Sequence, residues 1–116
     1  MTQENDPDDK TYRLKLDYVQ SFVEKIDALQ VIKNQLLDSD HIDECLKILQ
    51  NSAHKLAGSS GAYGFEQISS IAIDIEYLCI QYCSDHGQDY DQQSIELIQQ
   101  YIEKLIMLFQ RHVTVD

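Results

Sequence analysis

The sequence predicts an all-α protein folded as an antiparallel up-down four-helix bundle. The 116 residues contain one proline and four glycines, fewer than a sheet protein rich in turns requires. Apolar residues recur at three- and four-residue spacing in four long segments. Only short polar stretches separate these segments, and helices joined by short connections pack most simply with their neighbours antiparallel.

The first predicted helix follows an acidic stretch, residues 1–10, that we expect to be a disordered tail. A single domain is then expected over residues 11–116. Its first helix should run from Thr11 to about Leu37, with a break near Lys15 to Asp17. The expected buried face of this helix consists of Leu14, Tyr18, Phe22, Ile26, Leu29, Ile32 and Leu36.

Three further helices follow from the same spacing. The sequence DSD at residues 38–40 offers N-cap side chains for the second helix. Its expected buried face consists of Ile42, Leu46, Leu49, Ala53 and Leu56. The third helix, from about Phe65 to Asp85, should bury Ile68, Ala72, Ile75, Cys79 and Tyr82, and Gly87 is a candidate stop signal. The fourth, from about Tyr90 to His112, should bury Ile95, Ile98, Ile102, Leu105 and Phe109.

Charge and hydropathy narrow the class of protein. A net charge of −11 argues against binding to nucleic acid or to an anionic membrane, because both require a positive field. No apolar run approaches the roughly 20 residues that span a bilayer, and the acidic start does not resemble a signal peptide. We therefore expect a cytoplasmic, monomeric protein, and the Met1 start favours a free-standing one. Three cysteines agree with a reducing compartment.

The sequence contains little that indicates a metal-binding or nucleotide-binding enzyme. Cys79, Cys83 and His86 fall on one face of the third helix, which leaves open a metal-binding bundle. A structural zinc site usually takes four closely spaced ligands, so we favour buried cysteine and expect no metal or cofactor. The sequence has no Gly-x-x-x-x-Gly-Lys-Ser/Thr loop and no Gly-x-Gly-x-x-Gly. We expect neither ATP binding nor kinase activity.

The stretch NSAHKLAGSSGAYGFEQ, residues 51–67, does not look like ordinary helix packing, because it gathers three of the four glycines one turn after a histidine. At roughly 100° per residue, His54 lies about 120° from the buried direction, on a stripe with Lys47, Gly58 and Gly61. Since a helical side chain at i+4 leans over position i, Gly58 leaves the imidazole uncovered. Alternatively, Gly58 is the C′ cap of the helix and a loop follows.

This stretch resembles the histidine-containing phosphotransfer (HPt) domain family, whose motif is His-x-x-Lys-Gly-Ser/Ala-Ser/Ala-x-x-x-Gly. The matching residues are His54, Gly58, Ser59, Ser60 and Gly64. The resemblance implies that Nε2 of His54 accepts a phosphoryl group from an aspartate on a receiver domain. Response regulators and hybrid sensor kinases carry such domains, which would supply Mg²⁺ and a lysine.

The resemblance departs from the motif at one position, because Ala57 stands where most members carry lysine. Lys47, Lys55 and the hydroxyl of Ser59 are candidates to stabilise the phosphoryl charge in its place. With Gly58 and Gly61, these residues form the expected supporting set around His54.

The third helix adds two open questions. The family often has a polar or acidic residue at the place of Glu76, and we favour a solvated or bundle-edge carboxylate over a role in the chemistry. Ile73, Tyr77 and Ile80 form a second apolar stripe that we expect to complete a wide core, although it could contact a partner. The alternative to a phosphoryl carrier is a four-helix adaptor that is not phosphorylated and binds a signalling partner through the same face.

Overall fold

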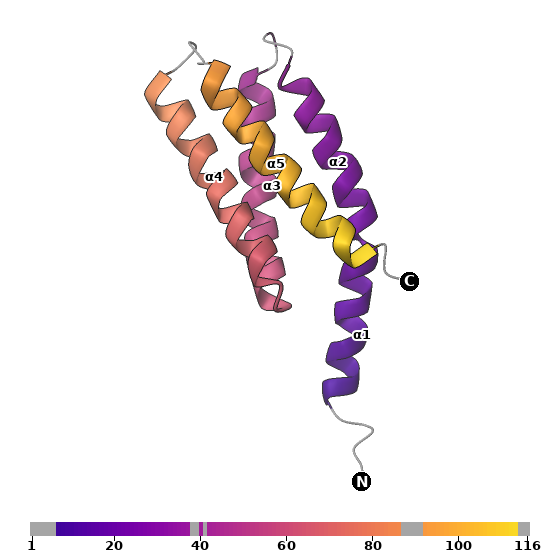
Figure 1. Ribbon diagram of the computed structural model, residues 1–116. Helices are drawn as coiled ribbons and strands as arrows, with labels where there is room; N and C mark the ends of the chain where they lie inside the picture. The colour runs from indigo at the N-terminus through magenta and orange to yellow at the C-terminus, as the bar shows by residue number, and fades with distance from the viewer. Residues whose placement is uncertain (1–6, 38–39, 41, 87–91, 114–116) are drawn as a thin grey trace.

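The protein folds as a four-helix bundle with one additional helix at its N-terminal end (Figure 1). The computed structural model describes the backbone of residues 7–37, 40, 42–86 and 92–113, and this part of the chain contains helices and turns but no strand. The helices are α1 (Pro7–Gln20), α2 (Phe22–Gln35), α3 (Ile42–Ala62), α4 (Glu66–His86) and α5 (Gln92–Val113). The predicted fold class is confirmed.

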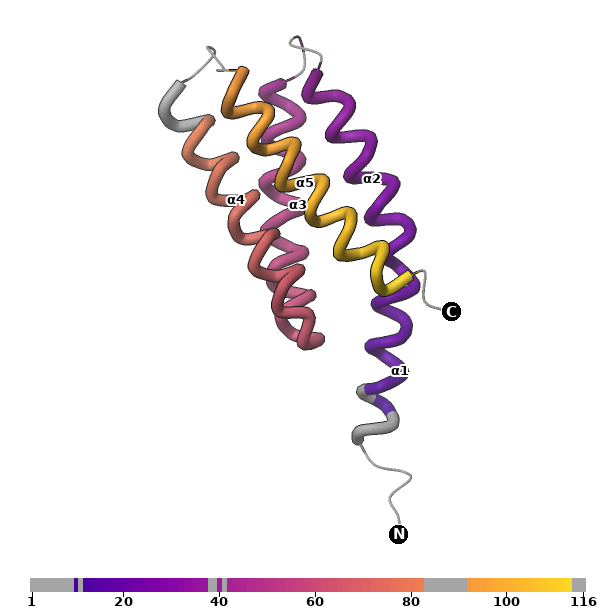
Figure 2. The backbone as a smooth tube through the Cα atoms, in the orientation of Figure 1, coloured from indigo at the N-terminus to yellow at the C-terminus, as the bar shows by residue number. Residues whose placement is uncertain are grey.

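Helices α2 to α5 alternate in direction, as the tube view shows (Figure 2). Helix α3 packs on α4, α4 on α5, and α5 on α2, while α2 touches α3 over a shorter stretch. The four helices enclose one apolar core. Its largest fully buried side chains are Phe22, Leu36, Leu46, Leu49, Ile68, Ile75, Ile98, Ile102, Leu105, Ile106 and Phe109. No helix in the described part is long and apolar enough to cross a membrane.

The buried faces agree with the predicted helical spacing in most places. Every residue predicted to be buried on α4 and α5 is buried, and on α3 only Ile42 is half-buried instead. The prediction for Leu14 is wrong, because its side chain is 47% exposed. Leu14 lies on α1, which extends beyond the end of the bundle where no other helix covers it (Figure 1).

The first predicted helix is interrupted at Ser21, not near Lys15 to Asp17 as the sequence suggested. The Ser21 hydroxyl donates to the carbonyl of Tyr18 at 2.5 Å, and the Ser21 amide donates to the carbonyls of Tyr18 and Asp17. A serine side chain that competes for backbone carbonyls in this way bends a helix.

Helix α1 already begins at Pro7, so the last part of the expected disordered tail is helical. Residues 1–6 lie outside the described residues.

The turn from α3 to α4 determines how the two helices face each other. The amide of Phe65 donates to the carbonyl of Ser60 at 2.8 Å, and that of Gly64 to the carbonyl of Gly61 at 3.1 Å. These two bonds form a Schellman motif, whose C′ residue is Gly64 with φ of +87°. Gly58 is therefore not the helix cap, and α3 continues for a further turn. Of the proposed caps, residues 38 and 39 and Gly87 lie outside the described residues, and Asp40 lies within them.

Candidate functional site

His54 lies in the middle of α3 on the exposed side of the helix, as helical spacing predicts. Its side chain is 74% exposed, whereas the preceding residue, Ala53, is buried in the core. Within the described part of the chain, Nε2 of His54 has no hydrogen-bond partner, so its outer nitrogen faces solvent. An imidazole in this position can react with a group carried by another protein.

The inner nitrogen of His54 is held by a carboxylate from the neighbouring helix. Nδ1 lies 2.9 Å from Oε2 of Glu76, whose side chain is 23% exposed between α3 and α4. When Nδ1 carries the proton it donates to this carboxylate, and the lone pair of the neutral ring is then on Nε2. Glu76 is thus a carboxylate at the edge of the bundle, one of the two forms that we favoured from the sequence. Because a carboxylate only accepts hydrogen bonds, this contact orients the ring and favours the neutral tautomer with its proton on Nδ1.

Small residues bring α3 and α4 close enough for this hydrogen bond. A Cβ added to Gly61 would lie 3.3 Å from the hydroxyl oxygen of Ser69, so this position allows little more than glycine. The Ser69 hydroxyl in turn donates to the carbonyl of Ala57 at 2.9 Å. Gly61 therefore allows α3 and α4 to pack closely. It is one turn too far along α3 for its side chain to cover His54.

Gly58 has a different environment from Gly61. A Cβ built at Gly58 meets no atom within 4 Å, and the residue is helical and exposed. Neither packing nor backbone conformation requires glycine here, which in a helix interior costs about 1 kcal/mol relative to alanine. The open space lies one turn after His54, where a longer side chain would lean over the imidazole.

Two exposed lysines accompany His54 on α3. Lys47 lies two turns before it on the same stripe, and Lys55 is its neighbour in sequence. Neither forms an ion pair within the residues that the structure describes, so both ammonium groups are available to an anion. Ala57, at the motif's lysine position, is half-buried against the core.

Ser59 is not brought to His54. It lies on the opposite flank of α3, where its hydroxyl and that of Tyr18 form a hydrogen bond of 2.6 Å. Burial raises the pKa of the Tyr18 phenol, an effect that its hydrogen bonds to Ser59 and Ser60 partly offset. Tyr18 also stacks on Tyr63, with ring centroids 4.6 Å apart. Ser59 thus attaches α3 to the junction between α1 and α2.

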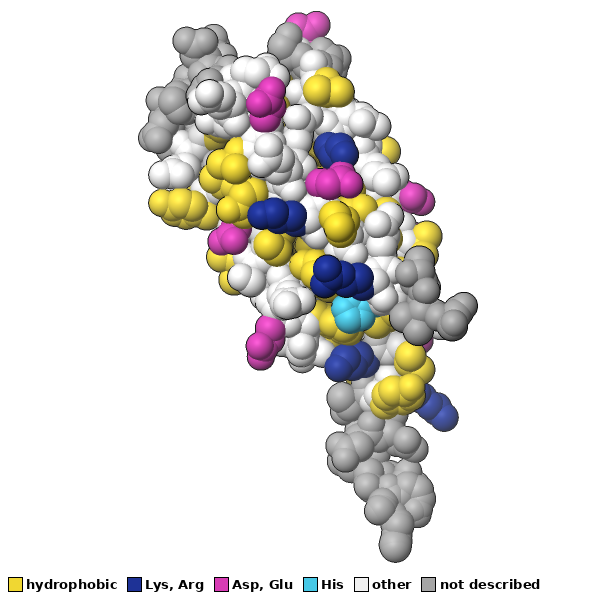
Figure 3. All heavy atoms as spheres, viewed as in Figure 1, with side chains coloured by type: hydrophobic (Ala, Val, Ile, Leu, Met, Phe, Trp, Pro, Cys, Tyr) yellow, Lys and Arg dark blue, Asp and Glu magenta, His cyan; other side chains and the backbone are white. Residues whose placement is uncertain are grey.

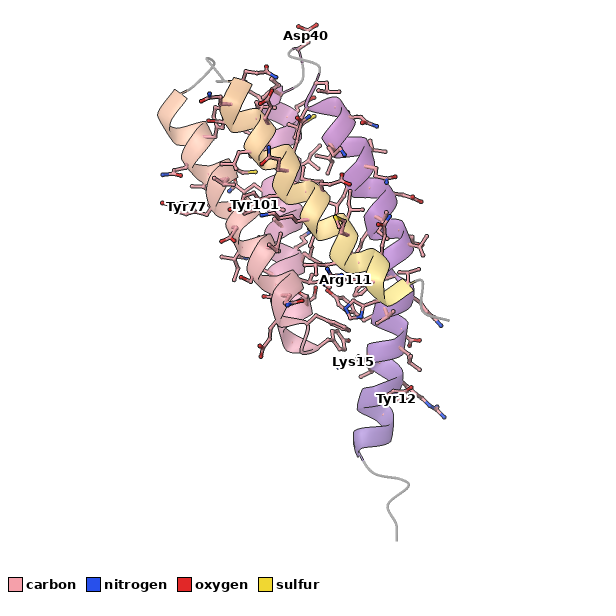
Figure 4. All side chains as sticks on the ribbon, viewed as in Figure 1. Tyr12, Lys15, Asp40, Tyr77, Tyr101 and Arg111 are labelled. Carbon is pink, nitrogen blue, oxygen red and sulfur yellow. The ribbon has the colours of Figure 1, made fainter. Side chains whose placement is uncertain are left out.

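The second apolar stripe of α4 is exposed, so the prediction that it completes a wide core is wrong. Ile73, Tyr77 and Ile80 are 52%, 60% and 42% exposed, and Figure 4 shows Tyr77 pointing away from the bundle. Ile73 and Ile80 are three and four residues from Glu76, so they flank it on the same side of α4. The imidazole therefore has an exposed apolar border.

The metal-binding alternative is not tested by the structure, which describes the side chain of only one of its three residues, Cys79. The described residues contain no group of three His, Cys, Asp or Glu side chains that could hold a metal ion. Cys79 is a buried thiol outside any disulfide. The side chains of Cys83 and His86 lie outside the described part.

The fold and the site define a class of protein: a small helical bundle with one oriented imidazole exposed at its surface. A family model described as Hpt domain matches residues 17–107, and the chain belongs to this family of histidine phosphocarriers. Hpt domains carry phosphoryl groups and are not kinases. No curated protein and no solved structure gives a significant match.

Proposed function

We propose that this protein carries a phosphoryl group on Nε2 of His54 between aspartates of receiver domains in a two-component phosphorelay. The observation that carries the proposal is the geometry of His54, which is exposed at Nε2 and held at Nδ1 by Glu76. Receiver domains of response regulators or hybrid sensor kinases are the proposed partners. The bundle encloses its own core, and we propose that it acts as a monomer.

The reaction needs only one nucleophile from this chain. The lone pair of Nε2 attacks the phosphorus of an aspartyl phosphate, the new N–P bond forms, and the P–O bond to the aspartate breaks with its electrons leaving on the carboxylate. Nδ1 keeps its proton throughout, so the ring becomes cationic as Nε2 shares its lone pair. The carboxylate of Glu76, 2.9 Å from Nδ1, stabilises this charge. Transfer to the next aspartate runs in the opposite sense: the N–P bond breaks with its electrons returning to Nε2, and a new P–O bond forms to the carboxylate of that aspartate.

The surroundings of His54 suit docking of a second protein. Ile73, Tyr77 and Ile80 offer apolar contact beside the imidazole, and the open space at Gly58 admits the partner's surface. Lys47 and Lys55 offer positive charge for the phosphoryl oxygens. Transfer of this kind depends mainly on alignment and charge neutralisation.

The test uses purified protein with two phosphoryl donors. Wild type should acquire acid-labile, alkali-stable phosphate from a phosphorylated receiver domain of the same genome, and also from phosphoramidate, a small donor that needs no docking. His54→Gln should acquire none from either. If the wild type binds receivers but accepts phosphate from neither donor, the protein is the alternative, an adaptor that is not phosphorylated.

A further inference from the structure

The second half of α5 carries positive charge in a chain whose net charge is −11. From Lys104 to Val113 its ionisable side chains are Lys104, Arg111 and His112, with no carboxylate among them. Figure 3 shows Lys and Arg side chains and a histidine forming a band along this face, with apolar side chains between them. Lys104, Arg111 and His112 belong to α5, which lies in front of α3 in the view of Figure 1. His54 and its partner Glu76 belong to α3 and α4 instead.

Helix α1 extends the band at one end. Nζ of Lys15 lies 5.1 Å from the centre of the Phe65 ring, and that ring meets His112 edge-on with centroids 4.9 Å apart. Figure 4 shows Lys15 below Arg111 on this side of the molecule. We call Lys15, Lys104, Arg111 and His112 the basic band.

No cation of the basic band is neutralised within the described part of the chain. Lys104 lies over the ring of Tyr101 at 5.0 Å and Lys15 over that of Phe65, but neither has a carboxylate partner there, and Arg111 has none either. The next lysine towards the other end, Lys33, differs because it is paired with Glu103 at 2.5 Å. The basic band thus keeps its charge for a group outside the chain.

A groove with an apolar floor runs beside the basic band, between α4 and α5. It consists of two adjoining hollows of about 360 and 270 Å³ that share Gln67 and Leu108. Ile71, Leu108 and Met107 form the floor, and Met107 is 50% exposed.

The two sides of the groove differ in charge. Lys104 and Arg111 stand on its α5 side, while Gln67, Ser70 and, at one end, Glu66 line the α4 side. Asp74 continues the α4 side by helical spacing. An occupant should therefore be acidic along one flank only.

We propose that this groove binds an acidic amphipathic helix of a partner protein. Lys104 and Arg111 are seven residues apart, so they stand about 10 Å from each other along α5. Carboxylates two turns apart on a second helix match this spacing, while its apolar face covers Met107 and Leu108. Neither His54 nor Glu76 lines the groove, so the partner helix would leave the imidazole exposed.

Charge and chemistry distinguish this occupant from a polyanion. Nucleic acid would bring phosphates on all sides to a chain of net charge −11, and the apolar floor would have no counterpart in a phosphate backbone. An amphipathic helix places charge only where the cations are and offers apolar contact to the floor.

Fluorescence anisotropy with two synthetic peptides tests the proposal. The first has about 18 residues, enough to form a helix, with leucine at helical spacing and glutamate along one flank. The second has lysine in place of each glutamate. The acidic peptide should bind the full-length protein, more tightly at low salt, and the basic peptide should not. The double variant Lys104→Glu, Arg111→Glu should weaken binding at least about fivefold.

Matched variants keep the experiment decisive. Lys10→Glu, Arg13→Glu makes the same change in net charge on α1 and should alter binding less than about twofold. Lys104→Gln, Arg111→Gln, which adds no carboxylate, replaces the first double variant if circular dichroism shows that one unfolded. The proposal would be overturned if the wild type bound both peptides equally or bound neither. It would also be overturned if the variants at Lys104 and Arg111 bound the acidic peptide as tightly as the control variant on α1.

The same variants also reveal whether the groove binds a different kind of ligand. Binding of duplex DNA or of anionic vesicles that depends on Lys104 and Arg111, without binding of the acidic peptide, would show that the class of partner is wrong. Wild-type dimers in sedimentation that the double variant dissociates would assign the groove to a second copy of this chain. Both results contradict the proposal.

Discussion

Nδ1 of His54 on α3 and Oε2 of Glu76 on α4 lie 2.9 Å apart, and this hydrogen bond connects the two helices at the centre of the exposed face. The two residues are equally far along the chain from Phe65, as are Gly61 and Ser69, which also meet. The Schellman turn thus sets the register of an antiparallel helix pair, and this register places a carboxylate behind the imidazole.

Replacing Glu76 should slow phosphorylation of His54 without unfolding the protein. Glu76→Ala removes the acceptor for Nδ1–H and the charge that stabilises the cationic ring, and we expect the transfer rate to fall roughly tenfold, which corresponds to about 1.4 kcal/mol in the barrier. Glu76→Gln keeps an oxygen acceptor without the charge, so its transfer rate should lie between those of the wild type and Glu76→Ala. Single-turnover transfer from a phosphorylated receiver measures the rates.

The tautomer population of His54 distinguishes a role of Glu76 in orienting the ring from a role only in stabilising the fold. Nitrogen NMR of His54 should show the Nδ1–H tautomer prevailing in the wild type, less so in Glu76→Gln and least in Glu76→Ala. Unchanged tautomer populations in the alanine variant would refute the role of Glu76, even if the transfer rate fell.

Helical spacing predicted the fold because each bundle helix buries one face throughout its length. The exposure of His54 followed from the same geometry, since it depends only on the residues of α3. The contact between Glu76 and His54 was not predicted because it depends on how α4 faces α3, and a single helix carries no information about its neighbour. Recognising Gly64 as the turn glycine, instead of leaving Gly58 as a candidate cap, would have provided the register.

The remaining errors have similar physical causes. Leu14 follows the helical spacing of the first segment, but α1 extends beyond the end of the bundle, so no other helix covers this side chain (Figure 1). Ile73 and Ile80 are apolar residues at helical spacing, and this spacing alone does not show which of two apolar faces of a helix packs inward. The bend at Ser21 depends on a side chain bonding its own backbone, which gives no periodic signal.

Two alanine substitutions should separate the roles of the glycines after His54. Gly58→Ala should raise the free energy of unfolding by about 0.5–1 kcal/mol, because the added methyl meets no atom and alanine favours the helix. Gly61→Ala should gain less or lose stability, because its methyl would displace the Ser69 hydroxyl from the carbonyl of Ala57. Urea unfolding of both variants measures the difference, and equal gains would contradict the assigned packing role of Gly61.

A longer side chain at Gly58 should act on transfer and not on folding. Gly58→Gln is expected to keep wild-type helix content and to slow transfer from a receiver strongly, because the side chain leans over His54. Phosphoramidate, which needs no docking surface, should be affected less. Wild-type transfer rates from the receiver would show that the space at Gly58 has no function.

The Tyr18–Ser59 hydrogen bond should contribute to stability in a pH-dependent way. Tyr18→Phe removes it and should cost roughly 0.5–1.5 kcal/mol. Burial raises the pKa of Tyr18 above its ordinary value of 10.0 in the folded protein. Above pH 10 the unfolded state therefore loses this proton first, and wild-type stability falls as pH rises through the folded pKa.

Comparison with the phenylalanine variant isolates Tyr18 from the other tyrosines. The stability difference between wild type and Tyr18→Phe should be constant below pH 10 and shrink above it, in urea unfolding at a series of pH values. Phosphoryl transfer at neutral pH should be little changed, since Ser59 does not reach His54. A difference that grew above pH 10 would contradict the raised pKa.

His54 itself should be dispensable for folding. Its side chain is 74% exposed, so His54→Gln is expected to change the free energy of unfolding by no more than about 0.5 kcal/mol while abolishing phosphorylation. Thermal unfolding measures this. A loss of several degrees in melting temperature would show that the hydrogen bond to Glu76 holds α3 and α4 together as well as orienting the ring.

Phosphorylated His54 adds nearly two negative charges to an acidic protein, so the nearby lysines should influence how much of it forms. An exposed ion pair contributes roughly 0.2–1 kcal/mol, which limits each effect to a few-fold. Lys55→Ala should lower the ratio of phosphohistidine to phosphoaspartate at equilibrium with a receiver. Lys47→Ala should lower it less, because Lys47 lies two turns away.

Ala57→Lys should raise the same ratio by a similar factor. Its stem would pack where Ala57 is half-buried, and the ammonium group would reach solvent about one turn from the imidazole. All three effects should shrink as salt screens the charges. The measurement is the equilibrium ratio for each variant at low and high ionic strength, with Lys10→Ala on α1 as the matched control. If Lys55→Ala and Lys10→Ala give the same ratio at low salt, Lys55 does not stabilise the phosphoryl group, and its place in the supporting set is wrong.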